Sequence, residues 1–241
     1  MNEIWREVEK IPRVTRFITL SSISITILSF FVPAYLGMHT SLVIPQFWRA
    51  YTSLFILPSS IGGLFDLLIL FKTSSDLEGS GMGRAGAGYA WSRIIDALFI
   101  LLLNYPINAF SLFRSFFLSV VYTQSILSPN SHVSLFGLVS IPNYAYPYVI
   151  LAIDLLIGGP VIVLFGLMGI IAAHFRHTLS IFPSPVPALI RNTLTTPPQW
   201  FEKWWISSES RERHTGFGTA INPTQSRSQT HNWGGGRRLA D

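Results

Sequence analysis

Long apolar segments separated by short polar ones constrain this chain more than any other feature. Six of them stand out, at residues 17–33, 54–71, 94–107, 109–127, 146–158 and 160–175. Segments of this kind are typical of helices that cross a bilayer, for which about 20 residues are needed. Because 49% of the 241 residues are hydrophobic and only 12% are charged, a soluble domain of this size is excluded. The sequence therefore predicts an all-α membrane protein with six transmembrane helices.

The distribution of basic residues predicts the orientation of these helices. Most basic residues lie before the first apolar segment, after the last one, or between the second and the third, whereas the opposite loops offer only Arg49 and Arg114. Cytosolic loops of membrane proteins carry an excess of lysine and arginine. Both termini are therefore expected in the cytosol, which requires an even number of spans. Because the last two segments are short, a single helix broken at Gly158-Gly159-Pro160 is the alternative.

The chain divides into four parts by composition. We expect residues 1–16 to form a cytosolic N-terminal segment and residues 17–176 to form the membrane domain. Residues 177–206 are rich in proline and tryptophan, which predicts an irregular segment leading into a short interfacial helix. Residues 207–241 are polar and are expected to form a disordered cytosolic tail. Several spans are shorter than about 20 residues, so we expect the protein to thin the bilayer or to tilt in it.

A compact peptide rich in glycine, arginine and bulky apolar residues ends the polar tail. Trp233 and Leu239 can fill two apolar pockets of a partner, and the three glycines between them let the backbone approach it closely. The sequence therefore predicts a docking peptide. The net charge of +5 comes from scattered basic residues rather than a basic stripe, so nucleic acid is not an expected partner.

A catalytic serine is the first kind of active site to consider. Serine hydrolysis within a membrane needs a nucleophile on a tight turn beside a histidine, and Gly-x-Ser-Gly at the start of a span is its signature. The spans lack this motif, and Glu78-Gly79-Ser80-Gly81 lies in an expected flexible cytosolic loop. We therefore expect no enzyme activity. The enzymatic alternative uses Ser119 or Ser125 together with His174.

Metal and ion sites are the remaining candidates for chemistry. His174 and His177 lack a third ligand nearby and the chain has no cysteine, so we expect neither a metal nor a cofactor. Asp66, Asp96 and Asp154 lie inside or at the edge of apolar segments, where a carboxylate is costly. Hydrogen bonding between helices, or a polar groove wall, is the favoured interpretation. A proton or ion path is the alternative, and the absence of an internal repeat counts against a transporter.

Several short stretches follow one another in a characteristic order: Pro12-Arg13-Val14-Thr15-Arg16, the Trp48-Arg49 pair, Leu77-Glu78-Gly79-Ser80 with Arg84, Leu135-Phe136-Gly137-Leu138, Gly169 to His174 followed by Phe182-Pro183, and the C-terminal peptide. Together they resemble the derlin family, the rhomboid-related pseudoproteases of endoplasmic-reticulum-associated degradation. The resemblance implies a rhomboid-like bundle of six transmembrane helices in the endoplasmic reticulum membrane. It also implies a non-catalytic role in moving misfolded proteins out of that compartment.

The resemblance assigns roles to three groups of residues. Trp48 and Arg49 match the family's Trp-Arg motif, and we expect Trp48 at the membrane interface and Arg49 on phosphates or loop carbonyls. Gly169, Ala173 and His174 match its small-residue packing motif, although Ala173 replaces the second glycine. The third group resembles the box by which derlins bind the AAA+ ATPase valosin-containing protein: Asn232, Trp233, Gly234, Gly236, Arg238 and Leu239. An endoplasmic reticulum ubiquitin-ligase complex, misfolded clients and the lipid bilayer are the other implied partners.

Overall fold

The computed structural model describes residues 11–38, 46, 48–80, 86–135, 139–181 and 188–212. The long helices are α2 (Arg13–Phe31), α5 (Ile61–Gly79), α6 (Ala87–Asn104), α7 (Phe113–Leu127) and α8 (Tyr146–Ile181). The shorter elements are α3 (Pro33–Leu36), α4 (Trp48–Ser53), β1 (His132–Leu135), β2 (Val139–Pro142), α9 (Ala188–Thr195) and α10 (Gln199–Glu212). The expected ATPase-binding box and residues 213–241 of the expected tail lie outside the described residues.

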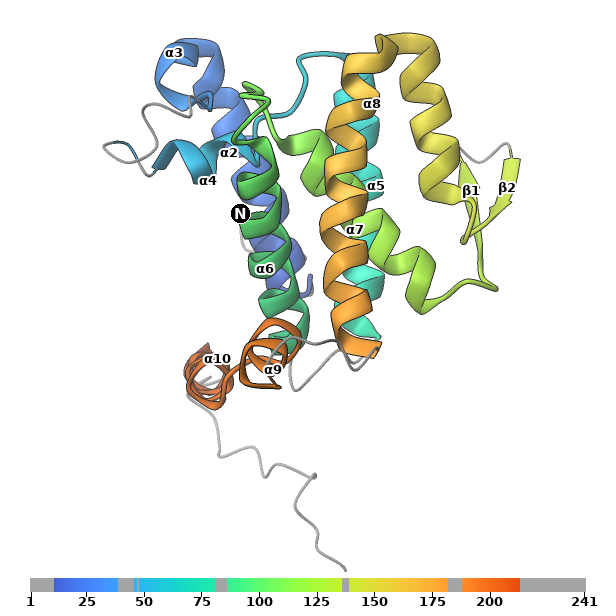
Figure 1. Cartoon of the computed structure of the whole chain (residues 1–241). Coiled ribbons are helices and arrows are strands. Elements are labelled where there is room, and N and C mark those ends of the chain that lie inside the picture. Colours follow the sequence, from blue (N-terminus) through green and yellow to red (C-terminus); the bar gives the residue numbers. More distant parts are fainter. Residues whose placement is uncertain are drawn as a thin grey trace, which may run out of the picture.

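Helix α7 is the centre of the bundle, and α5, α6 and α8 all pack against it (Figure 1). Its side chains Phe113, Phe117, Leu118, Val120 and Val121 are completely buried. Eleven of the 15 residues of α7 are buried, polar ones among them, which requires neighbouring helices on most of its sides. The remaining long helix, α2, packs on α5 at the edge of the bundle.

Helix α8 folds back on itself, as Figure 1 shows. The break lies at Gly159, whose φ of 74° and ψ of −176° are not helical. A Cβ atom on Gly166 would lie 2.7 Å from the side chain of Leu151, whereas a straight helix would separate these two residues by roughly 22 Å. The positive φ is available to glycine at little cost. Segments 146–158 and 160–175 are therefore two helices packed against each other.

Within the described residues, three helices, α2, α6 and α8, are long and apolar enough to cross a membrane. The two halves of α8 correspond to the fifth and sixth apolar segments of the sequence. Helix α7 has only 15 residues, and α5 carries four charged side chains, at Asp66, Lys72, Asp76 and Glu78. Leu156 and Ile157 are each 85% exposed on the outside of the bundle. Large outward-facing apolar side chains of this kind fit a surface covered by lipid.

The second apolar segment is not a helix over its predicted range. Helix α5 begins at Ile61 because the Ser60 side chain caps it, accepting a hydrogen bond from the backbone N–H of Gly63 at 3.3 Å. Residues 54–57 are buried without being helical. Side chains satisfy their backbone: the N–H of Leu57 donates to Thr26 Oγ1 at 3.0 Å, and Ser111 Oγ donates to the carbonyl of Ile56 at 2.8 Å.

The prediction of an all-α fold is wrong at one place. Strands β1 and β2 pair antiparallel, with His132 opposite Pro142, and the two form a small hairpin after α7. The fully buried Asn143 closes it, because its side-chain amide donates to the carbonyls of Gln124 and Ser128 at the end of α7. Each of these carbonyls also accepts a backbone N–H, from Ser128 and Ser131 respectively, so the amide of Asn143 adds a further bond that ties the hairpin to the end of α7. The fold is mostly helical, with this hairpin attached.

The segment after the bundle is more helical than the sequence predicts. Helix α8 runs to Ile181, α9 lies inside the segment expected to be irregular, and α10 continues past Ser207 to Glu212. Pro198 precedes α10, where its missing N–H costs nothing, and Glu202 adds a negative charge to the first turn. Phe201 of α10 is buried and packs on Trp91 of α6 at a centroid distance of 5.2 Å.

Candidate functional site

An acidic cluster of Asp66, Arg114 and Asp154 joins three helices on one level of the bundle. Arg114 of α7 donates from Nη1 to Asp66 Oδ2 at 2.6 Å, and from Nε and Nη2 to the two carboxylate oxygens of Asp154. The three side chains are only 9 to 18% exposed. Helices α5 and α8 both pack on α7, so Arg114 ties them together through their aspartates. The cluster has a net charge of −1.

A basic cluster of Arg93, Asp96 and Arg176 lies on a second level. Asp96 of α6 is completely buried, with Arg93 Nη2 at 2.8 Å and Arg176 Nε at 2.7 Å from its oxygens. Both arginines also donate to Thr123 Oγ1 of α7, at 2.9 and 3.2 Å. The ring of Tyr89 lies 5.2 Å from Arg93 Cζ. This cluster has a net charge of +1 and connects α6, α7 and α8.

The two clusters are close together along the bundle. Arg114 and Thr123 lie nine residues apart on α7, which corresponds to about 14 Å along the helix axis. Completely buried apolar side chains of α7, such as Phe117, Leu118 and Val121, fill the level between them. The mainly apolar stretch of α7 between the clusters, which includes the buried hydroxyls of Ser115 and Ser119, is therefore about half as long as the roughly 30 Å hydrocarbon core of a bilayer is thick.

Asp66, Asp96 and Asp154, the three aspartates inside or at the edge of apolar segments, thus take part in ion pairs between helices. The sequence does not reveal their partners, because Arg93, Arg114 and Arg176 are counted there as charges that flank the spans. One signal is available for Arg114, which lies within the fourth apolar segment and needs an opposite charge there. Arg93 lies three residues before Asp96 on α6, a local spacing that the sequence shows, whereas the pairs of Arg114 and Arg176 join residues 40 to 80 positions apart, which no local pattern encodes.

A polar contact at the start of α2 explains one of the family-like motifs. Glu78 at the end of α5 accepts hydrogen bonds from the backbone N–H groups of Val14 and Thr15 at 2.9 and 2.8 Å. Pro12 at the N-cap position supplies no side-chain bond. Glu78 therefore replaces the missing cap of α2. Glu78 and Gly79 belong to α5 rather than to the flexible loop that the sequence predicts, whereas Gly81 lies outside the described residues.

Replacing Glu78 with alanine is expected to destabilise the start of α2 by about 1–2 kcal/mol, the usual cost of losing a helix cap. The measurement is hydrogen–deuterium exchange of the amides of Val14 and Thr15, which should become faster. Asp76→Ala is the matched control, because Asp76 is an exposed carboxylate on the same helix. Equal exchange in the Glu78 and Asp76 variants would contradict this capping role.

The Trp48-Arg49 pair begins α4. Arg49 is buried, and its Nη1 donates to the carbonyl of Gly37 at 2.8 Å while its Nε contacts Gln46 Oε1. The sequence predicts that Arg49 binds phosphates or loop carbonyls, and the carbonyl of Gly37 is a partner of the second kind. Trp48 is 42% exposed. Together with the bond from Thr52 Oγ1 to the carbonyl of Leu36 at 2.7 Å, Arg49 fixes α4 to the chain that follows α3.

The small-residue motif lies where the second half of α8 crosses α7. A Cβ atom on Gly169 would lie 1.9 Å from the backbone oxygen of Ser115, so the two helices touch backbone to backbone. Ser115 Oγ adds a hydrogen bond to the carbonyl of Phe165 at 2.6 Å. Ala173, which replaces the family glycine, is 1% exposed and fits this interface.

The histidine of that motif faces a tyrosine. His174 Nδ1 lies 2.7 Å from the hydroxyl of Tyr122. The two serines of the enzymatic alternative donate to carbonyls of their own helix, Ser119 to Phe116 and Ser125 to Tyr122. No hydrogen bond within the described residues connects either serine to His174. In the same part of the chain, no three histidine, aspartate or glutamate residues are grouped so as to hold a metal ion.

Comparisons with known proteins agree with these motifs. A family model described as "Der1-like family" matches residues 11–198. Derlin-1 of Arabidopsis thaliana is 32% identical over 187 residues, which cover 74% of this chain and 67% of the relative. Derlin-1 of Homo sapiens is 28% identical over an alignment of 258 positions that covers 100% of both chains. Derlin-1.2 of Zea mays is 28% identical over 176 residues, or 71% of this chain and 70% of the relative.

Proposed function

The chain belongs to the Der1-like family, and from that premise we propose that it is a non-catalytic, derlin-like component of endoplasmic-reticulum-associated degradation. It is a membrane protein. In this proposal it crosses the endoplasmic reticulum membrane six times with both termini in the cytosol. It assists misfolded proteins in leaving that compartment and recruits a cytosolic AAA+ ATPase, beside a ubiquitin-ligase complex.

The observation that carries the mechanism is the pair of charged clusters about 14 Å apart along α7. A full bilayer would bring both clusters within reach of hydrocarbon, where ionised groups are costly. Lipids next to the bundle lower this cost by thinning, so that water and headgroups approach the clusters. A thinner bilayer in turn lowers the barrier for a polypeptide, whose backbone N–H and C=O groups need partners throughout the membrane.

The arrangement of serines and histidine supports a role without catalysis. A serine nucleophile needs a base within hydrogen-bond reach. Ser119 is completely buried in α7 and donates to the carbonyl of Phe116, while His174 pairs with Tyr122. Neither serine is positioned to attack a peptide. The proposal therefore assigns the energy-consuming step to the recruited ATPase.

The C-terminal peptide supplies the link to that ATPase in this proposal. A short motif on a tail raises the local concentration of its partner next to the bundle, even when its own affinity is modest. Trp233 and Leu239 are its apolar anchors, and Arg238 adds a positive charge between them. An aromatic anchor in a pocket commonly dominates the energy of such contacts.

We expect the double variant Trp233→Ala and Leu239→Ala to lose the ATPase while inserting normally into the membrane. The measurement is co-purification of the ATPase with the full-length chain, together with the half-life of a misfolded client in cells that lack the wild-type protein. Binding should fall by at least about tenfold, because losing an anchoring aromatic costs roughly 2 kcal/mol or more. The client should then be degraded more slowly.

The double variant Thr224→Ala and Gln225→Ala is the control, since both residues lie in the tail outside the box. It should behave as wild type in both assays. Co-purification of the ATPase at wild-type yield with the Trp233 and Leu239 variant would remove the box from the proposal. Unchanged client degradation in cells without any copy of the chain would overturn the function itself.

A further inference from the structure

The basic cluster carries more positive charge than the described residues neutralise. Asp96 is the carboxylate that pairs with both Arg93 and Arg176, and in the described part of the chain no second carboxylate pairs with either guanidinium. Their side chains are 5 and 12% exposed. Hydroxyl groups and the ring of Tyr89 surround the arginines, and these groups satisfy donors without supplying a negative charge. A surplus charge held within an apolar bundle is costly unless an anion compensates it.

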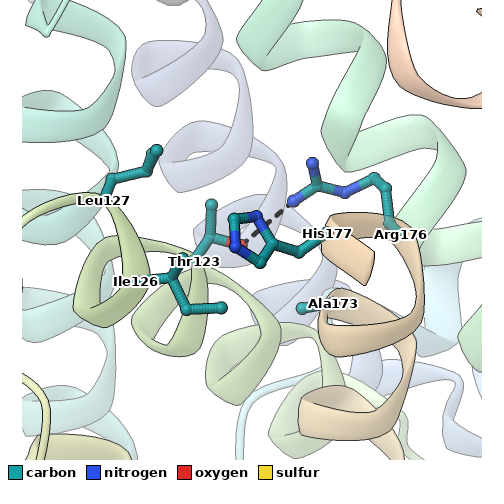
Figure 2. Close-up of a pocket in the computed structure, with 6 residues that line it drawn as sticks. All are labelled: Thr123, Ile126, Leu127, Ala173, Arg176 and His177. Atoms are coloured by element: carbon teal, nitrogen blue, oxygen red, sulfur yellow. Dashed lines mark hydrogen bonds between the residues drawn. The ribbon is translucent and has the colours of Figure 1, made fainter. Parts of the chain in front are cut away.

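A pocket opens beside this cluster, between α7 and the second half of α8. Six residues line it: Thr123, Ile126, Leu127, Ala173, Arg176 and His177. Figure 2 shows the imidazole of His177 projecting from α8 across the gap toward α7, next to the guanidinium of Arg176. Thr123 Oγ1 accepts from Arg176 Nη2 and so fixes the guanidinium at the pocket wall. The pocket thus combines two nitrogen donors with a wall of aliphatic side chains.

The size and position of the pocket indicate what it holds. Its volume of about 30 Å³ is far below the roughly 300–1,000 Å³ of sites that enclose a whole small molecule, so only one end group of a ligand enters it. It lies at the end of the bundle where α9 packs on α8 and α10 packs on α6 (Figure 1). At this end Trp200 and Trp204 of α10 are 66% and 59% exposed, as is typical of side chains at a membrane–water interface.

We propose that the α7–α8 pocket is a phosphate site for an anionic phospholipid, with Arg176 and His177 as its donors. The phosphate neutralises the surplus charge of the basic cluster, and the acyl chains leave along Ile126 and Leu127, of which Leu127 is 47% exposed. Arginine and histidine are suited to this contact because charge-assisted hydrogen bonds to phosphate are strong. The same chemistry would serve free phosphate, so the two sources must be separated by experiment.

The test uses the full-length protein in detergent and counts bound lipid by native mass spectrometry. The probes are a short-chain phosphatidic acid, phosphatidylcholine with the same acyl chains, and inorganic phosphate. We expect phosphatidic acid to bind with a Kd at least about tenfold below that of phosphatidylcholine, a difference of roughly 1.4 kcal/mol. Inorganic phosphate should compete weakly, because it lacks the acyl chains that contact the aliphatic wall.

His177→Glu tests the site without touching the ion pairs of the cluster. It should weaken phosphatidic acid binding by at least about tenfold, because it places a negative charge next to the phosphate. Ser180→Glu is the matched control, since Ser180 is exposed, lies three residues further along α8 and lies outside the pocket lining. It should bind phosphatidic acid as wild type does.

Three outcomes would overturn the proposal. Equal affinity of wild type and His177→Glu for phosphatidic acid would place the lipid elsewhere. Equal affinity for phosphatidic acid and phosphatidylcholine would remove the role of the surplus charge. Tight binding of inorganic phosphate, unaffected by added lipid, would identify a site for a soluble anion. Arg176→Gln gives an independent check, because it removes the surplus charge itself and should abolish the preference for the anionic lipid.

Discussion

Replacing Arg114 with leucine is expected to lower the free energy of unfolding by about 3 kcal/mol. The substitution leaves Asp66 and Asp154 as two carboxylates of like charge, 18 and 9% exposed, without the guanidinium that both contact. Removing one partner of a buried ion pair costs about 3–5 kcal/mol, and the partial exposure of this cluster favours the lower end. In a chain of this length that corresponds to a thermal midpoint roughly 6–12 °C lower.

The thermal unfolding midpoint of the purified protein in detergent measures this effect. Arg191→Leu is the control, because it removes a guanidinium from α9, outside both clusters. Adding Asp66→Asn and Asp154→Asn to Arg114→Leu should recover much of the lost stability, since the triple variant leaves no uncompensated charge. A midpoint for Arg114→Leu equal to that of Arg191→Leu would show that the acidic cluster does not hold α5, α7 and α8 together.

Gly169→Ala is expected to destabilise the bundle by about 3 kcal/mol, at the upper end of the range for overpacking a core. The added Cβ atom would lie 1.9 Å from the backbone oxygen of Ser115, and a backbone atom cannot rotate away as a side chain can. Helices α7 and α8 must separate to accept it. Because the two halves of α8 and both charged clusters meet on α7, this separation should also speed hydrogen exchange in α7.

Gly79→Ala provides a matched comparison for this substitution. A Cβ atom on Gly79 meets nothing within 4 Å, and the residue lies in the last turn of α5. It should leave the free energy of unfolding unchanged or raise it by up to about 1 kcal/mol, because alanine favours the helix over glycine. The idea of a backbone contact at Gly169 fails if the two alanine variants unfold at the same temperature.

The sequence predicts the apolar part of this protein well and its polar interior poorly. Each expected span overlaps a helix or half of one, because apolar length is a local property. The start of α5 is an exception, since residues 54–57 are apolar and buried but lie outside a helix that Ser60 begins. Their backbone is satisfied by Thr26 and Ser111, and neither contact is visible in a local pattern.

Local patterns also reveal some of the candidate site residues, whereas contacts between distant segments stay hidden in the sequence. The small-residue spacing of Gly169 and Ala173 follows from helical periodicity, and the structure places this face against α7. The arginine partners of the aspartates depend on which helices become neighbours, so Arg114 and Arg176 could not be paired in advance. The C-terminal box stays a prediction, because its residues lie outside the described part of the chain.

The bond between Glu78 and the start of α2 sets an order for synthesis. The cap of the first long helix comes from a residue 64 positions after Val14, so two N–H groups of α2 stay without this partner until α5 has been made. At a synthesis rate of about 5–20 residues per second, that delay lasts roughly 3–13 seconds. During this interval the N–H groups of Val14 and Thr15 depend on water or on other partners, and the first turn of α2 is completed only when α5 arrives.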